Sequence, residues 1–213
     1  ALTGLAVIVL YKIGFTGFKT GPGVPGFALH LAHEWVILTN LLGLLLGFAL
    51  LSNHFEKSHI PALLPRFLPN DWKGAFLLLV MIFVLSGFLD NIAAAIIGGT
   101  IAATVFRRKV HIGYLAAIVA ASNAGGAGSV VGDTTTTMMW IDGVSPLVVM
   151  EAYVPAFAAL FVFGIPAALQ QHRHSPIVKE AKAGVHVDWS RVAIVLIILA
   201  AAIVTNILIN VHI

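Results

Sequence analysis

The sequence predicts an all-α protein that crosses a membrane several times. Hydrophobic residues make up 59% of the chain and charged residues 10%, whereas soluble domains carry about 25% charged residues. The mean hydropathy is +0.99. Several apolar segments also reach or exceed the roughly 20 residues that a membrane-spanning helix requires. These three observations make the lipid bilayer the first expected partner.

Composition also argues against several other classes of protein. The net charge of +3 is too small and too scattered to indicate a nucleic-acid partner. The chain has no cysteine, so neither a thiolate metal site nor a disulfide framework is expected. The pair His33-Glu34 lacks the second histidine of a zinc-protease motif, because residue 37 is Ile. We therefore expect neither an enzyme nor a bound cofactor.

The apolar segments divide the chain into successive helical elements. They comprise residues 1–18, 27–52, 74–106, 112–141, 146–169 and 191–211. The order along the chain is then scaffold helices within about 1–52, a hairpin at 74–106, a broken helix at 112–141, a returning helix at 146–169 and a further helix from 191. Residues 171–190 are polar and basic, which predicts a cytoplasmic linker. The chain is expected to be part of a longer protein.

The segment 74–106 is too long for a single span and carries Asp90-Asn91 at its midpoint. We expect it to fold as a re-entrant hairpin of two short helices, with these two polar residues at the tip. Helices that turn back at this point return to the side of the membrane from which they entered.

The positions of lysine and arginine along the chain test whether 74–106 returns to the side from which it entered. If 74–106 returns to its starting side, every lysine and arginine except Lys12 and Lys19 lies on one side of the membrane. The positive-inside rule makes that side cytoplasmic, which predicts a multi-pass protein of the inner cell membrane. Two complete spans would give the same distribution, so the bias excludes only a single crossing. It predicts cytoplasmic positions for Ser58, Lys109 and Ser175 and an outer position for Asp142.

The run from Ser122 to Trp140 interrupts the segment 112–141 with glycines and polar side chains. An unpaired backbone group costs several kcal/mol in hydrocarbon, so irregular backbone at membrane depth persists where it lines a cavity or a binding site. The glycines allow backbone conformations that are closed to other residues, and the polar side chains supply oxygens. We expect a broken helix whose ion or solute site includes Asn123, Gly125, Gly126, Ser129, Asp133 and Thr134.

Asp90 and Asp133 also have a simpler interpretation. Aspartate is a preferred helix N-cap, and each of the two precedes a helix-like run. A carboxylate at membrane depth costs about 2.5 to 3.5 kcal/mol on insertion scales, which favours a functional role. Capping and ion binding are compatible. Gly98-Gly99, by contrast, is expected to serve close helix packing.

Two motifs carry a resemblance to a known family. FLDNIAAAII (88–97) together with SNAGGAGSVVGDTTTTMMWIDG (122–143) resembles the NhaD-type sodium/proton antiporters. These belong to the ion transporter superfamily, which also contains citrate, dicarboxylate and arsenite carriers. The resemblance covers about residues 30–170. It implies two inverted repeats, each with a re-entrant hairpin and a broken helix whose tips meet at mid-membrane, and a homodimer formed through a scaffold domain.

The resemblance implies that Asp90-Asn91 occupies the hairpin tip and residues 123–133 the helix break. This chain supplies only one such repeat, because residues 1–170 correspond to the first and 191–213 begin an incomplete second. Half of the expected site is therefore missing from it.

The charge of the tips bears on the substrate. Helix N-termini are positive and suit a carboxylate substrate, but the carboxylates of Asp90 and Asp133 outweigh them. Sodium prefers hard oxygen ligands, which we expect Asp90, Asn91, Asn123 and Asp133 to supply, with Thr134 beside them. We predict sodium/proton antiport. The alternatives are a proton- or sodium-coupled carrier of citrate, another carboxylate or an arsenite-like oxyanion, and a half-length scaffold subunit that does not transport.

Overall fold

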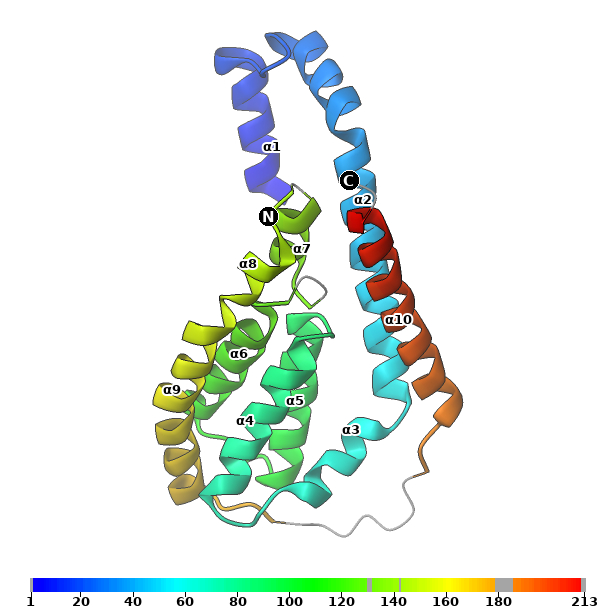
Figure 1. Ribbon diagram of the computed structural model, residues 1–213. Helices are drawn as coiled ribbons and strands as arrows, with labels where there is room; N and C mark the ends of the chain where they lie inside the picture. The colour runs from blue at the N-terminus through cyan, green and yellow to red at the C-terminus, as the bar shows by residue number, and fades with distance from the viewer. Residues whose placement is uncertain (1, 130–131, 142, 179–185, 212–213) are drawn as a thin grey trace. The chain divides into compact units, whose positions relative to one another are not determined.

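A computed structural model describes residues 2–129, 132–141, 143–178 and 186–211 (Figure 1). Within these residues every regular element is a helix, apart from an isolated bridge between Phe18 and Gly21. The prediction of an all-α fold is therefore confirmed. The expected outer position of Asp142, the middle of the linker 171–190 and the last residues of 191–213 lie outside the described ranges.

The first of two compact units is Ala1–Leu45. It contains α1 (Leu2–Tyr11), a π-helical continuation (Lys12–Thr16) and the first part of α2 (Gly23–Lys57). The turn between the helices is closed by paired backbone hydrogen bonds of 2.8 and 3.0 Å between Phe18 and Gly21. Large apolar side chains along both helices are exposed, which is typical of a surface that faces lipid or a partner.

The second unit is Leu46–Ile213 and holds the remaining elements. In chain order these are α3 (Ile60–Leu63), a 3-10 turn (Leu64–Phe67), α4 (Trp72–Ser86), α5 (Asn91–Val105), α6 (Ile112–Gly126), α7 (Thr134–Ile141), α8 (Pro146–Met150), α9 (Tyr153–His174) and α10 (Trp189–Val211). The core lies where α4 packs against α5, α6 and α9. Leu78, Leu79 and Ile82 of α4 are fully buried there.

These helices approach closely at a glycine and are joined by a hydrogen bond between residues distant in sequence. A Cβ on Gly98 of α5 would overlap the side chain of Ile82, so the absence of a side chain lets the two helices meet. A Cβ on Gly99, by contrast, would have no neighbouring atom within 4 Å. On the other side of α4, the buried hydroxyl of Tyr114 in α6 donates to the carbonyl oxygen of Ala75 at 2.6 Å.

Helices α4 and α5 run side by side as a helical hairpin (Figure 1). Each contains 15 residues and is therefore about 22 Å long, which is shorter than the roughly 30 Å hydrocarbon core of a bilayer. Asp71 caps α4 by accepting from the backbone N–H of Lys73 at 3.0 Å. The turn 87–90 forms the tip, at the end of the hairpin opposite Asp71.

The opposite end of the bundle is held together by Gln171, which is fully buried near the end of α9. Its Oε1 accepts from the backbone N–H of His111 at 2.7 Å, and its Nε2 donates to the carbonyl oxygens of Lys109 and Ser175 at 3.0 and 3.2 Å. The turn after α5 and the end of α9 therefore form one basic face. Sequence alone assigned Gln171 to the linker.

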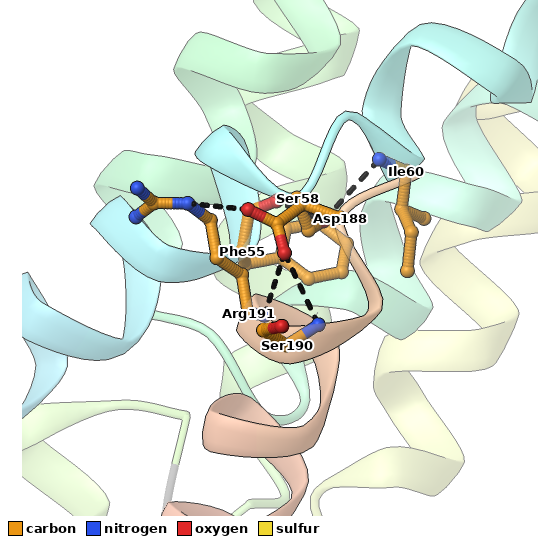
Figure 2. Close-up of polar contacts among 6 residues, drawn as sticks. All are labelled: Phe55, Ser58, Ile60, Asp188, Ser190 and Arg191. Carbon is orange, nitrogen blue, oxygen red and sulfur yellow. Dashed lines mark hydrogen bonds and ion pairs between the residues drawn. The ribbon is translucent and has the colours of Figure 1, made fainter. Parts of the chain in front are cut away.

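The start of α10 is attached to the elbow between α2 and α3 (Figure 2). The backbone N–H of Asp188 donates to the carbonyl oxygen of the buried Ser58 at 3.1 Å. Asp188 also caps α10, because its carboxylate accepts from the backbone N–H of Ser190 at 3.1 Å and pairs with Arg191 Nε at 3.1 Å. The end of the predicted linker is thus fixed to the helical unit.

Helix lengths differ from the predicted segments in two places. The segment expected at 146–169 is divided into α8 and α9, and α6 extends through Asn123 to Gly126, so the break begins after Gly126 and ends before Thr134. One stretch of the described residues, Pro146–His174, is long and apolar enough to cross a membrane, with a mean hydropathy of 2.0 in its most apolar window. Helices α4, α5 and α6 are apolar but shorter.

Candidate functional site

The hairpin tip and the helix break meet through a chain of side-chain hydrogen bonds. Asn123 donates from Nδ2 to the carbonyl oxygen of Val119 at 2.8 Å, which leaves its Oδ1 facing the tip. Asn91 Nδ2 donates to this Oδ1 at 3.0 Å and to Asp133 Oδ2 at 3.5 Å. An amide nitrogen carries two hydrogens, so Asn91 can serve both acceptors. The structure thus brings together Asn91, Asn123 and Asp133.

Both aspartates cap the helices that they precede. Asp90 Oδ2 accepts from the backbone N–H of Ala93 at 3.3 Å, at the start of α5. Asp133 Oδ1 accepts from the backbone N–H of Thr135 at 2.7 Å, at the start of α7. The capping interpretation is therefore correct for both residues. Each carboxylate has lone pairs beyond those used by the cap, so capping leaves room for a further ligand.

Ser129 ties the break to the hairpin. Its hydroxyl donates to the carbonyl oxygen of Gly87 at 2.5 Å and accepts from the backbone N–H of Gly132 at 2.9 Å. Nearby, the hydroxyl of the buried Ser86 donates to the carbonyl oxygen of Ser122. Hydroxyls thus satisfy backbone groups of Gly87, Ser122 and Gly132, as irregular backbone at membrane depth requires.

The glycines of the motif lie at points of close approach. A Cβ on Gly125 would overlap the carbonyl oxygen of Phe83 in α4, and one on Gly126 would lie 3.2 Å from the Cβ of Asp133. A Cβ on Gly132 would overlap the carbonyl oxygen of Ser86. Gly125 and Gly126 therefore allow segments of backbone to approach closely around the polar side chains. They have no side chain to offer as a ligand.

The threonines that follow the break have separate roles. Thr136 Oγ1 donates to the carbonyl oxygen of Ser129, and Thr137 Oγ1 donates to that of Asp133 at 2.8 Å. Both side chains are buried, as expected for hydroxyls that satisfy backbone groups. Thr134 is the first residue of α7, directly after Asp133, and is partly exposed.

Tyr153 is a component of the site that the sequence motifs did not indicate. Its ring lies against Gly128, where a Cβ would be 2.5 Å from the ring atoms. Its hydroxyl lies close to the side chain of Ser129. Because Tyr153 begins α9, it links the returning helix to the break. The only signal in the sequence was a polar aromatic residue in an otherwise apolar run.

The site is acidic. Between Lys73 and Arg107, and again between Lys109 and Arg173, the sequence contains no lysine or arginine. The carboxylates of Asp90 and Asp133 therefore have no basic side chain within their segments. Among the described residues, no three His, Cys, Asp or Glu side chains form a cluster able to hold a metal ion. The arrangement offers carboxylate and amide oxygens, the ligand type that a hard monovalent cation prefers.

A helical hairpin that faces an interrupted helix, in a chain this apolar, is typical of membrane transporters whose sites lie at broken helices. The chain belongs to the citrate transporter family, because the family model described as CitMHS, citrate transporter, matches residues 1–213. This places it among ion and solute transporters of membranes and confirms the superfamily that the two motifs indicated.

A relative of known name matches part of the chain. Over 90 residues the chain is 36% identical to sodium/proton antiporter 1 of Arabidopsis thaliana. The match covers 41% of this chain and 15% of the length of the relative. No solved structure matches the chain.

Proposed function

We propose that this chain is a repeat of a sodium/proton antiporter of the inner cell membrane, and that Asp90 and Asp133 bind sodium and protons alternately. Asn91 and Asn123 complete the sodium ligands. The hairpin α4–α5 enters and leaves the membrane on the cytoplasmic side, with its tip at mid-membrane. Two features support this placement: the helices are short, and basic residues follow the ends of the hairpin opposite the tip.

The observation that carries the proposal is the capping of both helix N-termini by the chain's own carboxylates. The positive end of a helix dipole carries about half an elementary charge and attracts anions. At α5 and α7 this position is taken by Asp90 and Asp133, each hydrogen-bonded to a backbone N–H group. Each terminus therefore presents a full negative charge beside a partial positive one, which favours a cation over citrate.

Exchange follows from competition for the same oxygens. When protons occupy the carboxylates, the site has lost its negative charge and releases sodium. When sodium binds between Asp133 and the amide oxygen of Asn123, the protons leave. The hydrogen bond from Asn91 to Asp133 keeps a donor on one carboxylate oxygen in either state, so the geometry of the site can persist through the cycle.

A citrate-coupled carrier is the second candidate, because the family model that matches is described as citrate transporter. In that case sodium bound at Asp133 would neutralise the site and admit a carboxylate substrate. We also propose that the site is completed by a second, inverted repeat and that two copies form a homodimer. The partly exposed Asn91 and the exposed Asn123 leave a face for those groups.

The experiment is sodium-driven proton movement in vesicles that contain the full chain. Asp133→Asn keeps the size of the side chain and an oxygen for capping but removes the charge, so we expect exchange to be abolished, and likewise for Asp90→Asn. The matched control is Asp71→Asn. Asp71 caps α4 of the same hairpin at its far end, where it accepts from Lys73 N–H and is exposed.

Loss of exchange in Asp133→Asn with normal exchange in Asp71→Asn supports the proposal. Unchanged exchange in Asp133→Asn restricts this residue to its capping role and contradicts it. A folded wild-type chain that moves neither sodium, protons nor citrate is the result expected of a non-transporting scaffold subunit, or of a site that needs its second repeat.

A further inference from the structure

Helices α6 and α9 line an open groove. Its volume is about 720 Å³, and its lining includes Ala116 and Ala120 of α6 and Phe163 and Pro166 of α9. The groove exists because alanines occupy the facing positions of α6, where larger side chains would fill the space between the two helices. It lies outside the polar site, whose residues do not line it.

The two ends of the groove differ chemically. Gln170 and Arg173 line it at the basic end of the bundle, where α6 begins and where Gln171 joins α9 to the turn after α5. Arg173 is exposed and forms no ion pair within the described part of the chain. Beyond Gln170 the named lining residues are apolar. The groove therefore fits a molecule with one anionic end and an apolar remainder.

We propose that the groove between α6 and α9 binds an anionic phospholipid of the cytoplasmic leaflet, with its phosphate at Arg173 and Gln170 and an acyl chain along Ala116, Ala120 and Phe163. A packed helix from another copy would need an apolar contact along its whole length and would cover Arg173 without a partner. Burying the Arg173 charge without a partner is less favourable than pairing it with a phosphate.

Arg173 belongs to the basic face at the end of the bundle that the proposed topology places at the cytoplasmic surface. It lies near the end of α9, on the face that also carries Arg107, Arg108 and Lys109. Arginine binds phosphate through several donors at once, and basic side chains at the cytoplasmic surface attract anionic lipids. The inference rests on the proposed cytoplasmic position of this face, in a chain whose family places it in a membrane, and it does not depend on which solute is transported.

The test measures phospholipid that stays bound to the full chain after extraction from vesicles of equal parts phosphatidylglycerol and phosphatidylcholine. We expect the wild type to be enriched in phosphatidylglycerol. Arg173→Gln should lower that enrichment about fivefold, since one basic side chain near the surface is worth about 1 kcal/mol. Ala116→Phe fills the groove, so the amounts of both bound lipids should fall.

Two control variants match these changes outside the groove. Lys73→Gln removes an exposed positive charge from the start of α4, at the same end of the bundle. Val119→Phe adds bulk at a position of α6 that is 53% exposed. Both should retain wild-type lipid. Monodispersity and helix content are measured for every variant. Because Arg173 is exposed, Arg173→Gln provides a result even if Ala116→Phe does not fold.

The proposal is overturned if Arg173→Gln keeps the wild-type enrichment, or if Lys73→Gln loses as much. It is also overturned if Ala116→Phe leaves bound lipid unchanged but converts dimers to monomers, because a second copy then occupies the groove. Loss of sodium/proton exchange in the aspartate variants with intact lipid binding would bear on the proposed function alone.

Discussion

The amide of Asn91, at the start of α5, donates to the Oδ1 atom of Asn123 in α6 at 3.0 Å. The two residues come from the two separate motifs of the sequence, and this bond joins them directly. Asn91 also reaches Asp133 at 3.5 Å. One side chain thus connects the hairpin tip to both sides of the helix break, so its removal should affect all three elements.

The first prediction concerns this pair. Asn91→Ala and Asn123→Ala should each weaken the apparent sodium affinity about tenfold, because each loses a ligand oxygen and a hydrogen bond that orients its partner. The double variant should be worse than either single one but better than full additivity, since it loses both ligand oxygens and only one shared hydrogen bond. Sodium titration of exchange in vesicles measures this. Fully additive losses would mean that the two residues act independently.

The second prediction separates the antiporter from a citrate carrier. Protons and sodium compete for the carboxylates of Asp90 and Asp133, so the apparent sodium affinity should weaken steadily as the pH falls. Citrate should neither bind nor change the exchange rate. Sodium-dependent uptake of labelled citrate that is lost in Asn91→Ala and Asn123→Ala would instead establish the carboxylate carrier.

The third prediction assigns a positioning role to Tyr153. Tyr153→Phe keeps the ring against Gly128 but removes the hydroxyl that lies close to Ser129. A polar contact of this kind contributes at most what one hydrogen bond does, about 0.5 to 1.5 kcal/mol, so the apparent sodium affinity should fall by up to about tenfold while the maximal exchange rate changes less. Tyr11→Phe, in α1, is the control. If Tyr153→Phe lowers the maximal exchange rate but leaves the apparent sodium affinity unchanged, the variant has simply lost folded protein.

The fourth prediction tests close packing at the break. Gly125→Ala brings a Cβ into the carbonyl oxygen of Phe83, and overpacking of this kind costs about 1 to 3 kcal/mol. Gly99→Ala meets nothing within 4 Å and should be neutral or stabilising, because alanine is the better helix former by about 1 kcal/mol. Thermal unfolding in detergent compares the two. Equal midpoints would show that α4 and α6 can separate without cost.

The sequence could predict the polar part of the site because Asp90, Asn91, Asn123 and Asp133 stand out in apolar surroundings. The composition and the lengths of the apolar segments likewise predict the all-α fold. Tyr153 and Gln171 could not be predicted in the same way. Each acts through a partner distant in sequence, and the position of that partner depends on how α9 packs against α6, which no local pattern encodes.

The residue at which the break begins also could not be predicted from local patterns. Asn123 and Gly125 favour irregular backbone on their own, yet α6 continues through both of them to Gly126. Tertiary contacts explain this, because α6 packs against α4 at Gly125, where only a glycine permits the approach. Packing thus extends the helix past the point at which propensity would end it.

The last prediction concerns topology. The chain has no cysteine, so single cysteines can be labelled without background. Ser58 and Ser175 are buried, and exposed neighbours serve better. Cysteines at Glu56, Lys109 and His174 should react with an impermeant maleimide only from the cytoplasm, and one at Ser145 only from outside. Labelling of positions 56 and 109 from opposite sides would indicate a single crossing and contradict the hairpin.

A further cysteine distinguishes the re-entrant hairpin from two complete spans, which the basic residues alone do not. Ile92, one residue into α5 from Asn91, is 66% exposed. In two complete spans the tip would emerge on the outer surface, and a cysteine at position 92 would then label from outside as fast as one at Ser145. If helices of about 22 Å stop at mid-membrane, it should label much more slowly from that side. Sodium should slow it further, since the tip then holds its ion.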